Sequence, residues 1–343
     1  MDTFLASIVV FGVLIFFHEL GHFMVAKMVG IKVHEFSLGF GPKIFSIPRG
    51  ETSYNLRALP LGGFVRMAGM DPSEDGEEDD ERGFNKKTVL QRIGVITAGP
   101  LMNFILAILL VAVFFMVLPN DPTTRVQDTL EGKPAAVAGI RTGDIITDID
   151  GKKIDNWDDM SKTIGASPGQ PIDIIVNRDG QRLTFKVVPY DESGVGKIGI
   201  HPSYIKSGPA KALFLGFRHT GIMSLQILDY LGKGISGQVP LELGGPVRIV
   251  ATISEAVRST SWFVNLLSLS AFLSVSLGLF NLFPIPALDG SRILFLVLEK
   301  LRGKPVEPQR ENFIHMVGFG LLVLLIVVIT YNDILQLITG KSG

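Results

Sequence analysis

Four long apolar stretches dominate this chain and leave few folds open to it. They run over residues 3–26, 93–118, 262–288 and 313–331. Each is close to the ~20 apolar residues needed to cross about 30 Å of hydrocarbon. A segment inside hydrocarbon must satisfy its own backbone hydrogen bonds, which a helix does and an open strand does not. The sequence therefore predicts a multi-pass α-helical membrane protein with four transmembrane helices.

A fifth apolar stretch, residues 212–231, is not predicted to cross the membrane. It is interrupted by Arg218, His219 and Asp229. A charged side chain at the centre of a membrane helix costs about 2.5–3.5 kcal/mol on insertion scales. We therefore expect an amphipathic helix that lies on the membrane surface or against the protein, within a helical linker over 204–260.

The distribution of lysine and arginine predicts the orientation of the helices. Residues 27–92 carry ten of these cations and residues 285–312 carry five. Because short cytoplasmic loops are enriched in lysine and arginine, both connections are expected in the cytoplasm and both chain ends outside. The long connection 119–261 is then extracytoplasmic. Its sixteen cations do not contradict this, because long translocated domains escape the rule.

The first apolar stretch contains the sequence "HELGH". Its only ionisable residues are His18, Glu19 and His22. Residues four apart lie on the same face of a helix, so the two imidazoles can converge on one ion. Two histidines with a carboxylate beside them are typical of a zinc hydrolase, in which the carboxylate is the general base. Ionisable groups inside a membrane helix usually mark function; the alternative is an interhelical hydrogen-bond cluster without metal.

A catalytic zinc needs a third protein ligand and one open position. Cysteine is absent from the chain, so the ligands must be nitrogen or oxygen. The metzincin pattern is also excluded, because it requires glycine and histidine where this chain has Val25 and Met28. The third ligand must therefore come from another part of the chain.

The predicted orientation returns the third apolar stretch to the depth of the two histidines, at "NLFPIPALDG". Asp289 is the first acidic residue after 27 uncharged ones, and Pro284 and Pro286 end the helix before it. We favour Asp289 as the third zinc ligand. His315, at the start of the fourth stretch, is the competing candidate.

Residues 119–203 predict an α+β domain. "PIDIIVNRDGQRLTFKVV" predicts a hairpin that turns at Asp179-Gly180, because apolar residues alternate on both sides of the turn. "GDIITDIDGKKI" predicts a strand before a second Asp-Gly turn, and "DNWDDMSKTI" a short helix. The segment "AAVAGIRTGDIITDIDG" resembles the core of a PDZ domain, a fold that binds extended peptides at a sheet edge. A folded spacer without a ligand is the alternative.

Residues 36–69 predict a membrane-associated β-hairpin that turns at Arg49-Gly50. Unpaired strand backbone is tolerated at membrane depth only where protein covers it or water reaches it. We expect this hairpin beside the zinc site, where its edge pairs with a substrate strand; a structural plug is the alternative. The following residues 71–81 include eight acidic residues and predict a solvated cytoplasmic loop.

Over nearly its whole length the chain resembles the site-2 proteases, of the bacterial regulator-of-sigma-E protease type. The resemblance rests on "HELGH", "LGFGP", "LPLGGFVRMAG", "TAGPLMN", the PDZ-like segment and "NLFPIPALDG". It implies an intramembrane zinc metalloprotease that carries out regulated intramembrane proteolysis. By this resemblance His18, His22 and Asp289 hold Zn²⁺ and Glu19 is the catalytic base. Several relatives have two PDZ domains, whereas this chain has room for one.

The resemblance also implies how substrates are bound and where the enzyme lies. Asn281, with Pro284 and Pro286, is expected to contact the substrate backbone. The expected substrates are single-span membrane proteins, such as anti-sigma factors already cut outside the membrane, and remnant signal peptides. The enzyme is expected in the bacterial cytoplasmic membrane, with the active site toward the cytoplasm and the PDZ domain outside.

These features divide the chain into four predicted regions. They are an N-terminal membrane domain (1–118), a PDZ domain (119–203), the helical linker (204–260) and a C-terminal membrane domain (261–343). A net charge of −1 argues against a nucleic-acid partner, which would require a basic face. The rival functions are a membrane adaptor with a vestigial zinc motif, a transporter with an intramembrane metal site, and a protease with its site outside. A transporter would show internal repeats, which we do not find, and the loop charges disfavour an outside site.

Overall fold

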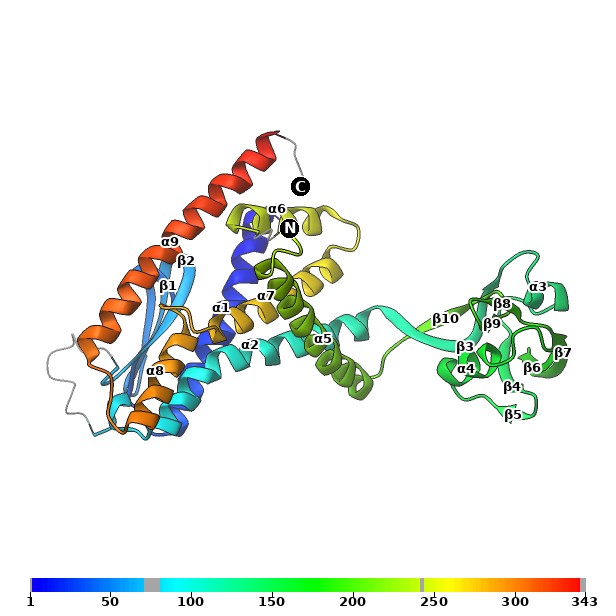
Figure 1. The fold of residues 1–343 in the computed structure, drawn as a ribbon, viewed down its shortest axis with the longest axis horizontal. Coiled ribbons are helices and arrows are strands. Elements are labelled where there is room, and N and C mark those ends of the chain that lie inside the picture. Colours follow the sequence, from blue (N-terminus) through cyan, green and yellow to red (C-terminus); the bar gives the residue numbers. More distant parts are fainter. Residues whose placement is uncertain (1, 71–80, 241–243, 340–343) are drawn as a thin grey trace. The chain divides into compact units, whose positions relative to one another are not determined.

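The computed structural model describes residues 2–70, 81–240 and 244–339 (Figure 1). By internal contacts the chain separates into two compact units. The first combines Met1–Phe114 with Ala212–Gly343, and the second is Phe115–Lys211. The acidic loop predicted over 71–81 lies outside the described residues, except for Glu81.

The first unit is mainly helical, and two of its helices extend a few residues past its boundaries. Its helices are α1 (Thr3–Met28), η1 (Phe84–Lys86), α2 (Val89–Val117), α5 (Pro209–Ile235), α6 (Pro246–Arg258), α7 (Trp262–Leu282), α8 (Asp289–Arg302) and α9 (Pro308–Thr339). Four segments are long and apolar enough to cross a membrane: Thr3–Met28, Val89–Val117, Trp262–Leu282 and Gln309–Gln336. They coincide with the four predicted stretches. The third is six residues shorter than its apolar run, because the chain leaves the helix before Pro284 and Pro286.

Residues 212–231 form part of α5, as predicted. Among the described helices, α5 does not meet the criteria of length and hydropathy for crossing a membrane. It packs closely on α2 at Gly216, where an added Cβ would lie 2.4 Å from the carbonyl oxygen of Ile108. The missing side chain therefore allows the two helices to touch.

A cluster of buried apolar residues joins α1, α2, α6 and α7. Its members are Ala6, Val10, Leu14, Leu106, Ile253, Ala256 and Leu266. The helix α6 is tied in addition to α9, because the backbone N–H of Arg248 donates to the Asp333 carboxylate over 3.0 Å. An acidic side chain from another helix thus caps the N-terminus of α6.

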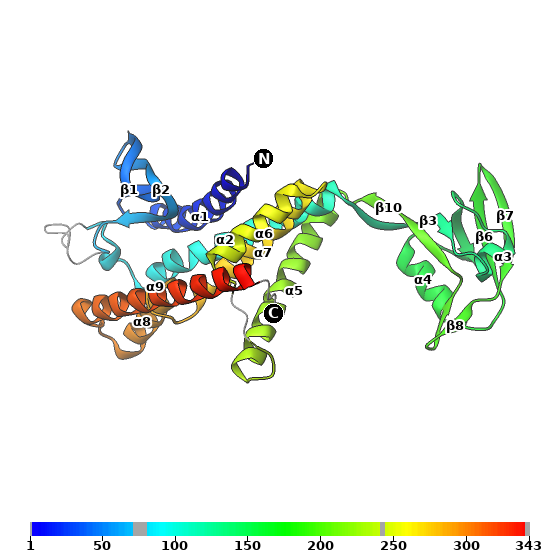
Figure 2. The ribbon, with the colours of Figure 1, turned by 90° about the horizontal axis from the view of Figure 1, so that it is seen from above.

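Two long strands, β1 (Val33–Arg49) and β2 (Thr52–Met67), pack beside α1 (Figure 2). Their register bends each strand into two segments. Residues 52–57 pair with 43–49 on one side and with 35–38 on the other, and 35–38 pair in turn with 63–67. The result is a sheet of four segments, in which 35–38 and 53–56 run parallel and the two outer pairs run antiparallel, with 63–67 at one edge. No further strand pairs with that edge among the described residues.

A buried carboxylate stabilises this sheet from within. Glu35 accepts hydrogen bonds of 2.5 Å from Ser37 and from Arg57, and Lys43 lies 3.5 Å away. Burial disfavours the charged form, but the hydrogen bonds outweigh it and lower the pKa of Glu35 to about 2. The group is therefore an anion at any physiological pH.

The second unit is an α+β fold around an antiparallel sheet of order β10-β3-β4-β6-β7, with β5 on β4. Its elements are β3 (Pro119–Thr129), α3 (Pro134–Ala138), β4 (Ile145–Ile149), β5 (Lys152–Lys153), α4 (Trp157–Gly165), β6 (Ile172–Arg178), β7 (Gln181–Val187), β8 (Tyr190–Glu192), β9 (Val195–Lys197) and β10 (Ile200–Lys206). The predicted hairpin is confirmed: Ile174 faces Phe185 across the Asp179-Gly180 turn. The predicted short helix is α4, and the predicted strand before the other turn is β4.

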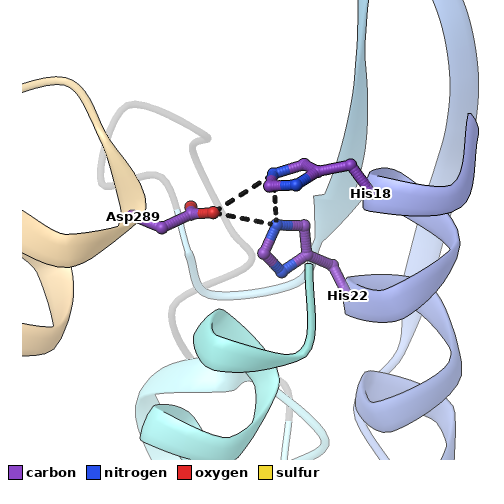
Figure 3. Close-up of side chains that lie close together, drawn as sticks. All are labelled: His18, His22 and Asp289. Atoms are coloured by element: carbon purple, nitrogen blue, oxygen red, sulfur yellow. Dashed lines mark hydrogen bonds and ion pairs between the residues drawn. The ribbon is translucent and has the colours of Figure 1, made fainter. Parts of the chain in front are cut away.

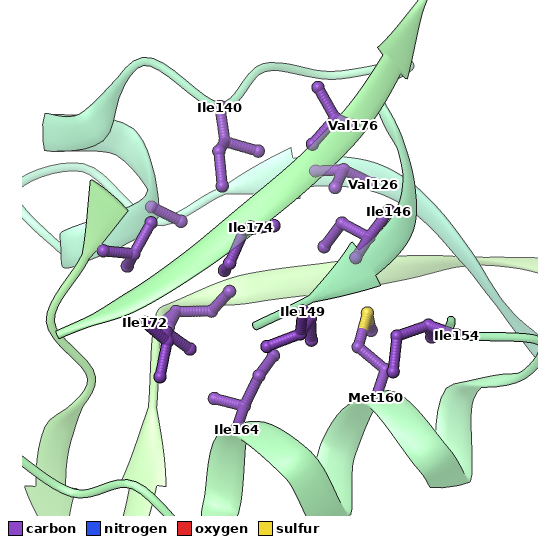
Figure 4. Close-up of a cluster of buried hydrophobic side chains, with 13 residues drawn as sticks. Val126, Ile140, Ile146, Ile149, Ile154, Met160, Ile164, Ile172, Ile174 and Val176 are labelled. Carbon is purple, nitrogen blue, oxygen red and sulfur yellow. The ribbon is translucent and has the colours of Figure 1, made fainter. Parts of the chain in front are cut away.

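The core of the second unit lies between this sheet and α4 (Figure 4). Ile146, Ile149 and Ile174 are fully buried, and Met160 and Ile164 project from α4 against them. At one edge of the core Asp144, only 1% exposed, accepts hydrogen bonds of 2.7 and 2.8 Å from the Arg178 guanidinium. Burial opposes ionisation of Asp144, but the Arg178 hydrogen bonds outweigh it and hold the pKa of the carboxyl below its ordinary value.

Replacing this carboxylate should destabilise the second unit in a pH-dependent way. We expect Asp144→Asn to lower the free energy of unfolding of the second unit by about 2 kcal/mol at pH 7. This is less than the ~3–5 kcal/mol lost on breaking a fully buried pair, because solvent reaches Arg178. A carboxylate whose pKa is lowered by folding stabilises the folded state above its unfolded pKa of about 3.9. This stabilisation is lost as the pH falls toward the folded pKa. The difference in free energy of unfolding between variant and parent should therefore become smaller toward pH 3. Hydrogen exchange of the β4 and β6 amides in the full chain measures it.

The matched control is Asp155→Asn, because Asp155 pairs with Lys153 on the open surface. We expect no measurable change in exchange from this variant. Equal exchange in both variants would contradict a stabilising role for Asp144.

Candidate active site

The helix α1 brings His18 and His22 together, and α8 adds Asp289 (Figure 3). The Nε2 atoms of the two histidines are 3.3 Å apart. Oδ2 of Asp289 lies 3.2 Å from Nε2 of His18 and 3.3 Å from Nε2 of His22. One ligand atom from each residue therefore falls within 4.8 Å of the others. His22 and Asp289 thus belong to one cluster, although they are 267 positions apart in the sequence.

Asp289 reaches this cluster because the chain reverses sharply after α7. The helix ends at Leu282, and Asp289 is the first residue of α8. An added Cβ on Gly290 would lie 2.2 Å from the carbonyl oxygen of Phe283. Only glycine therefore allows the start of α8 to fold back on the end of α7.

The three residues fit a metal ion. Oδ2 of Asp289 is buried and has no hydrogen-bond partner, and the two imidazole Nε2 atoms lie 3.2 and 3.3 Å from it. A buried anionic oxygen beside two imidazole nitrogens calls for a cation between them. Two nitrogens and one oxygen, with a fourth position open, match the ligand set of a catalytic zinc.

The orientation of His22 suits a ligand. Its Nδ1 lies 2.9 Å from the carbonyl oxygen of Val95, to which it can donate, and this leaves Nε2 free for an ion. The carbonyl comes this close because two glycines face the contact between α1 and α2. A Cβ on Gly21 would lie 2.2 Å from the Ala98 carbonyl oxygen, and one on Gly99 would lie 2.3 Å from Nε2 of His22.

A cavity of about 600 Å³ opens at the cluster. Glu19 and Asn281 line it together with the three clustered residues, and so does the edge segment 63–67 of β2. The described lining residues do not include Pro284 and Pro286, which were predicted to contact substrate together with Asn281. Both prolines lie in the turn between α7 and α8, and Pro286 packs against Gly318 of α9.

His315, the competing candidate for third ligand, has another place in the structure. Its Nδ1 accepts a hydrogen bond of 3.1 Å from the backbone N–H of Ala287. Ala287 adopts a φ of 75°, which is unfavourable for a residue with a side chain. His315 therefore supports the strained turn that leads to Asp289, and it does not belong to the group of three among the described residues.

Sequence reasoning missed the contribution of α2 to the site. Gly99 makes room for His22, and Asn103 places its side chain against His18. The available signal was a single amide in an otherwise apolar, uncharged stretch. Helical spacing within α2 could not say which helix this amide faces.

Comparison with known proteins gives matches over nearly the whole chain. The model of peptidase family M50 matches residues 6–325. The zinc metalloprotease RasP of Bacillus licheniformis is 35% identical, over 98% of this chain and 100% of the relative. The regulator of sigma-W protease RasP of Bacillus subtilis is also 35% identical, over 98% and 99% of the two chains. The PDZ domain of an SdrC-like protein from Listeria innocua matches with 26% identity and a TM-score of 0.22, over 23% of this chain and 92% of that one.

The close packing at Gly99 generates a prediction. An alanine there would push its Cβ into the His22 imidazole, and overpacking of this kind costs about 1–3 kcal/mol. Gly94→Ala on the same helix is the control, because a Cβ at Gly94 meets nothing within 4 Å. We expect Gly99→Ala to lower both the melting temperature and the bound-metal content of the purified protein. Gly94→Ala should leave both unchanged or raise the melting temperature slightly. Identical behaviour of the two variants would refute the packing argument.

Proposed function

Because the chain belongs to peptidase family M50 and is a zinc metalloprotease of the site-2 type, we propose that it cuts single-span membrane proteins within or near their transmembrane segments. Family membership implies regulated intramembrane proteolysis. The observation that carries the proposal is the convergence of His18, His22 and Asp289 at a cavity that also contains Glu19. Three of these four residues, His18, Glu19 and His22, belong to a helix long and apolar enough to cross a membrane.

In this proposal His18, His22 and Asp289 hold the zinc ion. Zinc bound there would supply Lewis acidity, which polarises a carbonyl group and makes water easier to deprotonate. Glu19 is the general base: it takes a proton from the attacking water and delivers it to the amine of the leaving peptide. Its presence in the same cavity as the three ligands supports this role.

A substrate helix must unwind before its peptide bonds can be attacked, because its carbonyls are engaged in their own hydrogen bonds. The freed backbone then needs new partners in a place from which lipid is excluded. We propose that Asn281 and the edge segment 63–67 provide them. Both line the cavity, and the outer edge of 63–67 has no strand paired with it among the described residues. An extended substrate can add to this edge as a further strand.

Pro284 and Pro286 were predicted to contact the substrate, and we propose a substrate contact for the turn that they shape. The turn joins α7, which carries Asn281, to α8, which carries Asp289. It therefore fixes the distance between the backbone-binding residue and the metal ligand. Two prolines lower the conformational freedom of such a turn.

The substrate class is proposed from the relatives. One of them is named for regulating sigma-W, which points to an anti-sigma factor as its substrate. We propose that this chain likewise acts on anti-sigma factors that another protease has already shortened, and on remnant signal peptides. The second unit is proposed to limit access to the site, either by binding a newly formed peptide end or by excluding large extracytoplasmic domains.

Cleavage should depend on Glu19. We expect Glu19→Gln to bind zinc normally but to lose at least ~100-fold in cleavage rate, because an amide cannot accept the proton from water. The measurement combines metal analysis with cleavage of a single-span substrate in lipid vesicles. Glu255→Gln is a matched control, since Glu255 is exposed on α6 and lies outside the cavity of the cluster.

Two outcomes would contradict the proposal. Full cleavage by Glu19→Gln would remove its role as base. If a zinc chelator does not affect cleavage by the parent enzyme, zinc has no role in the reaction. Zinc binding without any cleavage would instead favour a membrane adaptor.

The proposed sidedness can be tested because the chain has no cysteine. Lys152 and Lys304 are exposed, so single cysteines there should react with a thiol reagent that does not cross membranes. We expect Lys152→Cys to react in intact cells and Lys304→Cys only after permeabilisation, since the active site is proposed to lie toward the cytoplasm. The cysteine-free parent gives the background. Reaction of both positions from one side would contradict the proposed arrangement.

A further inference from the structure

Asn103 is fully buried on α2, and its side-chain amide faces His18. Its Nδ2 lies 3.0 Å from Nδ1 of His18. Its main-chain carbonyl oxygen accepts a 2.7 Å hydrogen bond from Ser274 on α7, which fixes the backbone at this position. Its side-chain oxygen Oδ1, however, is buried and has no hydrogen-bond partner. A buried amide oxygen without a donor is rare in native proteins and calls for an explanation.

The orientation of this amide conflicts with a ligand role for His18. Nε2 of His18 faces Asp289 and His22. A neutral imidazole that gives its Nε2 lone pair to an ion carries its proton on Nδ1, so Nδ1 is a donor. The amide nitrogen of Asn103 is also a donor. Nitrogen and oxygen of an asparagine amide have nearly the same shape and are assigned from their hydrogen-bond partners. Half a turn of the amide places Oδ1 against Nδ1–H and gives the unpaired oxygen its donor.

We propose that Asn103 is a positioning residue that accepts the Nδ1–H hydrogen bond of His18 through Oδ1 and so directs Nε2 of His18 toward the metal. The inference rests on the proposed zinc site. His22 has the equivalent support, because the Val95 carbonyl oxygen lies 2.9 Å from its Nδ1. The helix α2 therefore supplies one acceptor to each histidine, from its backbone for His22 and from a side chain for His18. Histidines that bind metals usually donate their other N–H to such an oxygen.

The competing explanation is that Asn103 only fills space between α1 and α7. Two variants with the same number and branching of side-chain heavy atoms as asparagine separate the explanations. Asn103→Asp keeps the shape and offers acceptors only, whereas Asn103→Leu offers none. Ser274→Ala is the matched control, because it removes the other hydrogen bond of Asn103 but leaves its side-chain amide in place.

The test measures zinc affinity of the full chain in detergent by competition with a chromophoric chelator. The absorption spectrum of the Co²⁺-substituted protein reports the ligand geometry independently of activity. We expect Asn103→Leu to weaken zinc binding about 10–100-fold, the usual effect of losing such a partner, and to change the cobalt spectrum. Asn103→Asp and Ser274→Ala should keep the affinity and the spectrum close to those of the parent.

Two results would overturn the inference: an unchanged affinity and spectrum in Asn103→Leu, or an equal loss in Asn103→Asp. If Asn103→Leu does not fold, Asn103→Ala takes its place, since it also lacks the acceptor and adds no bulk. Failure of the proposed function has a different signature, because the parent protein itself would then bind no zinc, or would bind zinc without cleaving a single-span substrate.

Discussion

The approach of α1 and α2 around His22 is the contact on which the rest of the site depends. Gly21 leaves room for the Ala98 carbonyl, and Gly99 leaves room for the His22 imidazole. The backbone of α2 consequently comes close enough for the Val95 carbonyl to orient His22. Membrane helices gain little from apolar burial against one another and associate through small residues that allow close packing. The same glycines therefore hold the two helices together and shape the site.

The turn between α7 and α8 and the edge of β2 bring the remaining parts of the site to this helix pair. Gly290 lets α8 begin directly against the end of α7, which places Asp289 opposite the histidines. His315 of α9 accepts the N–H of Ala287 and supports the strained turn before Asp289. The β2 edge at 63–67 adds backbone donors and acceptors to the cavity wall. Polypeptide thus encloses the polar site on several sides, and polar groups beside membrane helices need such partners from protein or from water in a cavity.

Some of this arrangement was open to prediction because it depends on local spacing. The i, i+4 separation of His18 and His22 places both on one helix face, whatever packs around them. Asp289 could be favoured as their partner from loop charges and from its position after a long uncharged run. The structure brings the three together, although their roles as ligands remain proposals. Pro284 and Pro286 were expected at the substrate; they lie in the turn before Ala287, which lines the cavity, and their contact with substrate stays a prediction. Sequence pattern says that a proline ends a helix, and it does not say which way the following chain turns.

The sequence by itself determined four membrane-length helices, a strand-rich second unit, and two histidines with a carboxylate on one helix face. Each follows from periodicity or composition within a short window, where backbone geometry alone fixes the relation between residues. Only the tertiary structure decided that Asn103 faces His18 and that His315 supports the turn at Ala287. In an apolar helix every face has nearly the same composition, so the direction in which a single amide or imidazole points is set by the helix that packs against it.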